Sequence, residues 1–393
     1  RLGASPRDFT LFHSRRIGLA EGRPVPIVGG GRLTGSVGDT ELGFLAMRTE
    51  SALGLPRENF AVARVRHSFA SGLQVGGLFA GRDAVGKGVN DYNRSYGADV
   101  NYAWAGKLLF HSYLSATDYP GAEGNNRAGR VSAAFRDQFW DVSALYREVG
   151  DAFDPGLGFV ARRGIRHSYG TLGVHPRPDL PGVLELNPYL EAHYITNMRS
   201  ALETREGTAG LGVLFSDGGQ MRSQVTDRLE IINEAFLVAG EGEVPAGRYR
   251  FTEASLTYTA SAARPLSGEV QLAGGEFFSG NRTSLTLSGN WRPSRHIALG
   301  LQAQRNDISL PGDEFTADVI GARVDFAGSR RLFLNSFVQY NTASEEVVTN
   351  IRLNLIHAPL SDIFLVFSER RNVEAGRVLE REITLKGTKL LSF

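Results

Sequence analysis

The feature that most constrains this chain is a two-residue alternation of apolar and polar side chains along nearly its whole length. After Thr283, for example, Leu285, Leu287 and Trp291 alternate with serine, threonine and asparagine. A period of two is the period of a β-strand, because successive strand side chains point to opposite faces. Such stretches recur at about 9–12 residues, the length of a tilted membrane strand. The pattern predicts an all-β chain.

The second face of these strands is small and polar, which indicates a wall along water rather than a packed core. No apolar run approaches the roughly 20 residues of a membrane-spanning helix, so a membrane location would require a closed barrel. The sequence shows no linker and no internal repeat of about 100 residues, which tandem sandwich domains would have. We therefore predict a transmembrane antiparallel up-and-down β-barrel of about 20 strands over residues 31–393. Residues 1–30 form an N-terminal lead-in or plug segment in this prediction.

The connections between the predicted strands differ in length. Gly38-Asp39 is typical of a short turn, whereas longer polar connections are expected around 81–93, 117–126, 148–163, 174–182 and 229–247. Alternating short and long connections are typical of periplasmic turns and extracellular loops. Trp104, Trp140 and Trp291 fall near strand ends and are expected at a membrane interface.

Composition excludes several kinds of function. Lys+Arg number 43 against 42 for Asp+Glu, without a basic run, so no nucleic-acid partner is expected. The absence of cysteine excludes disulfides and thiolate sites. The eight histidines form no metal-binding motif and no close pair in sequence, and no nucleophile elbow or phosphate loop is found. We expect no enzyme activity, no metal and no cofactor.

The two ends of the chain carry separate signals. Ile383, Leu385, Gly387 and Leu391 alternate up to a terminal Phe393, with Lys389 as the one departure on the apolar side. This ending resembles the signal by which the bacterial barrel-assembly machinery recognises its clients. The start at Arg1, without methionine or signal peptide, is expected of a mature or truncated product.

Several segments together resemble a known family. They are 12–19 (FHSRRIGL), 25–27 (VPI), 29–35 (GGGRLTG), 42–47 (LGFLAM), 153–160 (FDPGLGFV) and 358–364 (APLSDIF). The chain is similar in these to an uncharacterised family of bacterial outer-membrane proteins, a domain of unknown function. In that family a carbohydrate-binding (family 9-like) domain precedes a C-terminal barrel. The resemblance implies a barrel in the bacterial outer membrane and supplies no activity.

Charged residues on the polar faces are the candidate lumen residues. Opposed rows of arginine and carboxylate would favour polar or zwitterionic solutes, or would only brace and hydrate the wall by cross-strand ion pairs. Arg15 and Arg16 belong either to a plug or to a lead-in at the membrane interface. The lumen candidates are Glu185, Glu191, His193, Arg323, Asp325, Arg352, Arg130 and Arg147, with Arg136 and Asp141 also on polar faces.

Three functions remain open from the sequence. The first is a channel or transporter for small polar solutes. The second is a structural barrel that anchors a surface or periplasmic domain or docks an envelope complex. The third, a barrel enzyme such as a lipid hydrolase, lacks a recognisable Ser/His/acid trio. The expected partners are outer-membrane lipid, the barrel-assembly machinery during biogenesis and an envelope protein.

Overall fold

The computed structural model describes residues 9–20, 23–86, 90–359 and 361–389. The chain divides into two units. Unit 1 comprises Arg1–Gly173 and Glu191–Arg205, and unit 2 comprises Val174–Leu190 and Glu206–Phe393. The described residues hold one short 3-10 helix, η1 (Ser14–Arg16), and otherwise strands and turns. No helix among them is long and apolar enough to cross a membrane.

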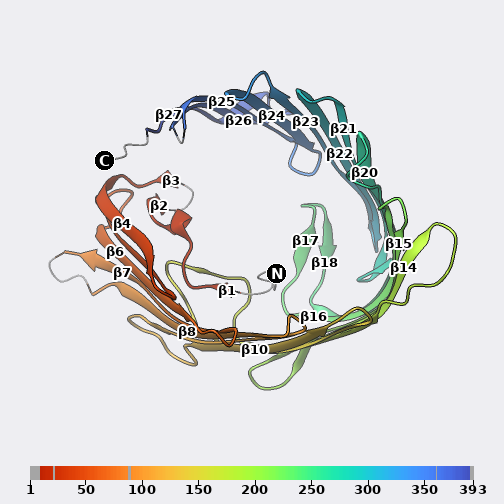
Figure 1. Cartoon of the computed structure of the whole chain (residues 1–393), viewed down its shortest axis with the longest axis horizontal. Helices are drawn as coiled ribbons and strands as arrows, with labels where there is room; N and C mark the ends of the chain where they lie inside the picture. Colours follow the sequence, from red (N-terminus) through yellow and green to blue (C-terminus); the bar gives the residue numbers. More distant parts are fainter. Residues whose placement is uncertain (1–8, 21–22, 87–89, 360, 390–393) are drawn as a thin grey trace. The chain divides into compact units, whose positions relative to one another are not determined.

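Unit 1 is an antiparallel sheet in which each long strand pairs with the next along the chain (Figure 1). Short strands precede it or lie in its loops: β1 (Phe9–Thr10), β2 (Leu19–Ala20), β3 (Arg23–Pro24) and β12 (Phe159–Val160). The long strands are β4 (Ile27–Val37), β5 (Thr40–Thr49), β6 (Arg57–Ser68), β7 (Leu73–Val85), β8 (Tyr92–Trp104), β9 (Leu108–Asp118), β10 (Arg127–Arg136), β11 (Trp140–Val149) and β13 (Ile165–Val174).

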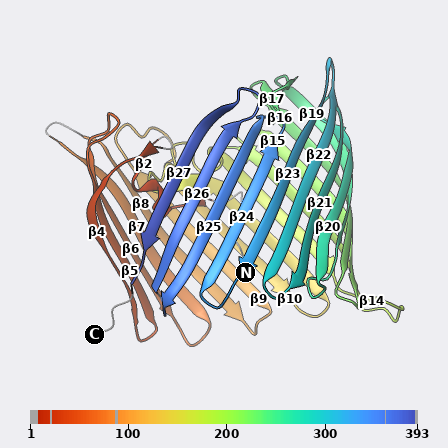
Figure 2. The same cartoon turned by 90° about the horizontal axis from the view of Figure 1, so that it is seen from above.

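Unit 2 repeats this order, and Figure 2 shows β20 to β27 running alongside one another. A short hairpin, β17 (Phe236–Val238) and β18 (Gly242–Val244), leaves the series after β16. Two strands, β14 (Val183–Asn197) and β15 (Leu202–Phe215), contribute residues to both units. The other long strands are β16 (Gln220–Ile232), β19 (Gly247–Thr259), β20 (Leu266–Phe277), β21 (Gly280–Ser294), β22 (Ile297–Leu310), β23 (Asp313–Ala327), β24 (Leu332–Asn341), β25 (Glu346–Ala358), β26 (Ser361–Asn372) and β27 (Arg377–Gly387).

Register places the alternating residues on two chemically distinct faces, here called the apolar face and the polar face. Leu287 on β21 lies opposite Val270 on one neighbour and Ala303 on the other. One residue away, Thr286 lies between Gln271 and Gln304. Because the side-chain period is two, each ladder carries apolar rows and polar rows in turn. The all-β antiparallel prediction is confirmed, and the described residues contain 21 strands of 10–15 residues.

The expected alternation of short and long connections holds only in part. In unit 1 the turns 38–39, 69–72, 105–107 and 137–139 lie at one strand end, and the longer connections lie at the other. In unit 2 most connections at both ends are short, and 233–246 is the long one after β16. The expected loops 81–93 and 229–247 were too wide, because pairing such as Arg82↔Asn93 and Glu230↔Tyr249 extends the strands into them.

The N-terminal segment 9–20 lies against the polar face of unit 1. Phe9 and Thr10 pair with Val160 and Phe159, and the Arg16 Nε atom donates to the Gly158 carbonyl at 3.1 Å. Two clusters fix the segment. Ile17 packs with Phe60, Val62, Ala80 and Leu157, and Phe9 and Leu11 pack with Ala128, Val149, Phe153, Ile165 and Ile195. Burial of these apolar groups holds the segment on a wall that is otherwise polar.

Unit 2 has a similar arrangement on its polar face. The β17–β18 hairpin packs Val244, which is fully buried, against Ile308 and Leu310 at the end of β22. Aromatic rings surround this contact, among them Phe315 and Phe277. Ile308 and Leu310 share the face of Gln304, so the hairpin covers the apolar end of a polar row.

The loop that carries Phe153 is tied to its neighbour by Asp151. The Asp151 Oδ1 atom accepts hydrogen bonds from the backbone N–H groups of Asn125, at 2.8 Å, and Ala152, at 3.0 Å. The bond from Asn125 in particular lowers the pKa of the Asp151 carboxyl below its ordinary value of 3.8. The depressed pKa means that the charged form stabilises the folded loop.

We therefore expect the loop contact to weaken at acid pH. Protection of the Asn125 and Ala152 amides from hydrogen exchange should be complete at about pH 6 and lost as the pH falls through the folded-state pKa, below about 3.8. Asp151→Asn should give weaker protection that no longer depends on pH in this range. Exchange measured by mass spectrometry tests this, with Asp179→Asn in another exposed loop as control. Unchanged pH dependence in Asp151→Asn would contradict the assignment.

Candidate functional site

A continuous row of charged and ring side chains crosses the polar face of unit 1 from β6 to β14. We call this row the polar belt. It collects residues from long strands that follow one another along the chain and in the sheet. The belt consists of Arg64, Asp99, Tyr113, Arg130, Arg147, His167, Tyr169, Glu191 and His193.

The belt begins with an ion pair that spans an intervening strand. Two N–H groups of Arg64 on β6 donate to the two carboxylate oxygens of Asp99 on β8, one of them at 3.0 Å. Gly76 on β7 lies between them, and a Cβ atom there would stand 2.6 Å from the Arg64 guanidinium. The missing side chain at Gly76 therefore allows this bidentate contact.

Two buried arginines lie side by side at the centre of the belt. Arg130 on β10 is the register partner of Arg147 on β11, and their exposed fractions are 9% and 2%. On its other side, Arg130 lies opposite Tyr113 of β9. Adjacent guanidinium groups on the polar face favour anionic solutes near the pair.

A directional chain of hydrogen bonds runs from Arg147. Its Nη2 atom lies 3.4 Å from His167 Nδ1, His167 Nε2 lies 3.0 Å from His193 Nδ1, and His193 Nε2 lies 2.8 Å from Glu191 Oε1. Arginine only donates, so His167 Nδ1 accepts and its Nε2–H donates to His193. His193 then donates to the Glu191 carboxylate, which also accepts from the Tyr169 hydroxyl at 3.4 Å. Both nitrogens of His193 therefore take part in the hydrogen-bond chain.

The N-terminal segment closes one side of a cavity over the belt. The cavity has a volume of about 480 Å³ and is lined by residues 9–12, by Arg64, Asp99 and Arg130, and by His111 and Tyr113. Phe9 packs edge-on against Tyr113, with ring centroids 5.1 Å apart. Gly97 in the wall leaves room for Leu11, whose Cδ1 would lie 2.6 Å from a Cβ there. The cavity therefore combines a charged wall with an apolar cover.

Four of the eight predicted lumen residues come together in this belt: Arg130, Arg147, Glu191 and His193. The two plug candidates lie in η1 above the same face. Arg16 is bonded to Gly158, and the side chains of Arg15 and Arg16 are exposed. The polar-face pair Arg136 and Asp141 forms a cross-strand ion pair at 2.9 Å. Phe393, the predicted assembly signal, lies outside the described residues.

The other four lumen candidates lie in unit 2 and form no single site. Glu185 accepts from His175 at 2.7 Å and from Arg177 at 2.9 Å, beside a polar cavity of about 560 Å³. Arg323 donates to Asp325 at 2.7 Å, and Asn335 donates to the other oxygen of the same carboxylate at 2.6 Å. Arg352 lies over the ring of Phe364, 4.6 Å from its centroid.

The sequence interpretation missed several belt residues. The histidines form no close pair in sequence, but in the fold His167 and His193 are hydrogen-bonded and their rings stack at 5.3 Å. They are 26 residues apart in sequence and meet because antiparallel neighbours bring distant positions together. Arg64 and Asp99 of the belt, and His111 of the cavity lining, were also missed. The two-residue alternation of their own strands predicts that they lie on the polar face, and it could have identified them.

Comparison with known proteins gives only distant similarity. No family model and no curated protein matches the sequence. Among solved structures, the ferric-catecholate import receptor Fiu of E. coli K12 has a TM-score of 0.44 at 8% identity, over 90% of this chain and 70% of that chain. The ferric preacinetobactin receptor BauA of Acinetobacter baumannii has a TM-score of 0.41 at 8% identity, over 91% and 69%. At these values the similarity is too low to assign a fold or an activity.

We predict that the Arg64–Asp99 pair contributes more to stability than an exposed pair of the same type. In a double-mutant cycle with Arg64→Gln and Asp99→Asn, the coupling free energy should be about 1–3 kcal/mol, because the side chains are only 33% and 17% exposed. The matched control is the cross-strand pair Arg250–Asp227, exposed by 66% and 35%, with an expected coupling of about 0–1 kcal/mol. Urea unfolding measures both. Equal coupling in the two cycles would refute the prediction.

Proposed function

We propose that this chain is a β-barrel of the bacterial outer membrane that passes small polar solutes along its polar face. The observation that carries the proposal is the two-faced wall present in both units. On the apolar face Leu114, Leu301 and Ile383 are 71%, 68% and 69% exposed. Soluble monomers rarely expose large contiguous apolar patches, whereas lipid accepts such a face.

The tryptophans support a bilayer on that face. Trp104 ends β8 and Trp140 begins β11, at the strand end of unit 1 that carries the short turns, and both are exposed. In unit 2, Trp291 lies exposed on the apolar face near the end of β21. Tryptophan is enriched at the membrane–water interface, where its ring lies at the level of the lipid headgroups.

Closure of the strands is part of the proposal. Backbone N–H and C=O groups left unpaired in hydrocarbon cost several kcal/mol each, so a sheet of this kind is stable in lipid only as a closed barrel. The same proposal includes three further points. The barrel-assembly machinery inserts the chain, an envelope protein binds it, and the chain is a member of the family in which a carbohydrate-binding domain precedes the barrel. Under it the chain has no enzymatic activity.

The polar belt supports a solute filter. It sets three arginines, Arg64, Arg130 and Arg147, against the carboxylates of Asp99 and Glu191. Such a wall offers hydrogen bonds to polar solutes and favours anions near the arginine pair. The N-terminal segment narrows the space over this wall and would limit passage to small molecules.

A structural barrel is the second candidate, and the same segment favours it. Residues 9–20 are held by two apolar clusters, which is more than a loosely attached lead-in requires. If the segment stays in place, it shields the part of the polar belt beneath it from solutes. The barrel would then serve to anchor or dock another envelope protein.

Single-channel conductance of the purified protein in a planar bilayer separates these functions. We expect discrete steps, with a reversal potential that favours anions in a salt gradient. Arg130→Gln should lower the anion preference because it removes one of the paired positive charges, while Arg352→Gln in unit 2 should alter it less. A correctly folded but silent barrel would exclude passive transport and leave the structural function.

A further inference from the structure

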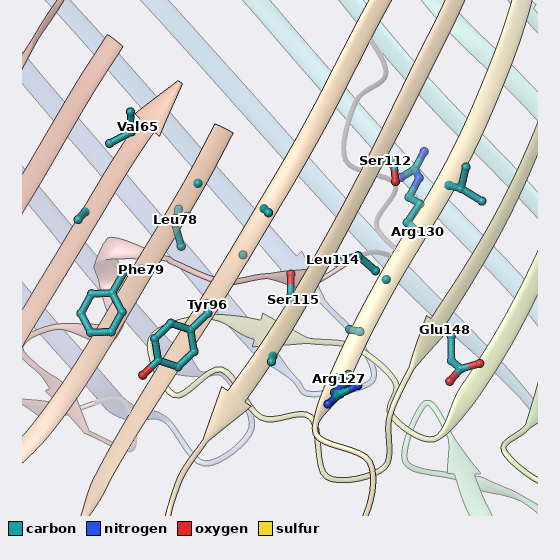
Figure 3. Close-up of a pocket in the computed structure, with 18 of the residues that line it drawn as sticks. Val65, Leu78, Phe79, Tyr96, Ser112, Leu114, Ser115, Arg127, Arg130 and Glu148 are labelled. Atoms are coloured by element: carbon teal, nitrogen blue, oxygen red, sulfur yellow. The ribbon is translucent and has the colours of Figure 1, made fainter. Parts of the chain in front are cut away.

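The apolar face of unit 1 carries a groove of about 970 Å³. Small residues such as Gly77 and Ala98 line it between larger side chains. Figure 3 shows the rings of Phe79 and Tyr96 side by side on neighbouring strands, with Leu114 farther across the groove. The groove is therefore a recess with bulky apolar walls on a face that otherwise bears projecting side chains.

Arg127 and Arg130 both line the groove, and register leads along its wall to Arg127. Phe79, Tyr96, Ala116 and Arg127 are successive register partners across β7, β8, β9 and β10. Arg127 is exposed and begins β10, next to the loop 119–126. The row thus runs from aromatic rings to a guanidinium at the strand end.

The other described cations at this end are already paired. Arg94 donates to Asp83 at 2.7 Å and lies opposite Asp118, and Arg166 donates to Glu148 at 3.0 Å. Within the described part of the chain, the Arg127 guanidinium has neither an ion-pair nor a hydrogen-bond partner. Its direct register partner is the apolar Ala116. An anionic group at the end of the groove would therefore meet Arg127.

We propose that this groove binds a phospholipid, with one acyl chain in the recess and the phosphate on Arg127. The proposal rests on the membrane location proposed above, and not on transport. Arginine presents a planar set of donors that matches phosphate oxygens. The side chains of Phe79, Tyr96 and Leu114 match an acyl chain, which gains van der Waals contacts by filling the recess. Glu148, whose carboxylate also lines the groove, is paired with Arg166 at 3.0 Å. A partner protein segment would need a charged group of its own to reach Arg127, whereas a phospholipid supplies the phosphate next to the chain.

Lipid retention by the full chain in detergent tests the proposal. Native mass spectrometry would count bound phosphatidylglycerol, and diacylglycerol with the same acyl chains serves as the probe without phosphate. We expect wild type to retain phosphatidylglycerol in preference to diacylglycerol. Arg127→Gln should lower phosphatidylglycerol affinity about tenfold, and Arg94→Gln, at a cation already paired, should leave it unchanged.

The second test of the proposal fills the recess with a larger side chain. A Cβ at Gly77 meets no atom closer than 3.9 Å, so Gly77→Leu should fold and occupy the groove. It should abolish retention of the lipid, whereas Gly289→Leu, at an open site on the apolar face of unit 2, should not.

Three results would overturn the proposal: equal retention of the two lipids, unchanged retention in Gly77→Leu, or a wild-type dimer that Gly77→Leu makes monomeric. The last result would identify a second copy as the occupant. A silent channel that retains the lipid would refute transport alone, and a conducting channel that retains none would refute the lipid site alone.

Discussion

The antiparallel hydrogen-bonded ladder is the constraint on which the rest of this structure depends. Pairing each strand with its neighbour satisfies the backbone and fixes every side chain to one of two faces. In β21 this rule sends Leu285 and Leu287 to one face and Thr286 to the other. Repeated over the 21 long strands of the described residues, it produces in each unit a wall that is apolar on one side and polar on the other. A wall of this kind separates lipid from water.

The same rule assembles the polar belt without any local motif. Arg130 and Arg147 become neighbours because their strands pair in that register, and His167 meets His193 in the same way. Glycine modifies the pattern because it has no side chain, and at Gly76 this allows Arg64 to reach Asp99. The N-terminal segment then adds an apolar cover to a charged wall. The chemistry of the site is thus a product of register and of a few absent side chains.

Period and composition were sufficient to predict the strands and the polar faces, including Glu191 and His193 as wall residues. They were insufficient for the partners of those residues. His167 needed the register between β13 and β14, which depends on strand lengths set by the whole ladder. The packing of Phe9 and Phe153 was equally hidden, because a loop that folds over a polar face shows no alternation of its own. Arg127 is the first residue of β10. It stands out as an arginine without an ion-pair partner only when the ion pairs of the neighbouring arginines in the described structure are known.

The most direct test of the two-faced wall is a labelling experiment on neighbouring positions of one strand. The chain has no cysteine, so Leu301→Cys and Gln302→Cys on β22 can each carry a single spin label. In lipid bilayers we predict that the label at position 301 collides with oxygen, which partitions into lipid, and that the label at 302 collides with a water-soluble nickel chelate. The pair Val142→Cys and Ser143→Cys should repeat the result in unit 1. Equal access of both labels to the chelate would contradict a membrane-embedded apolar face.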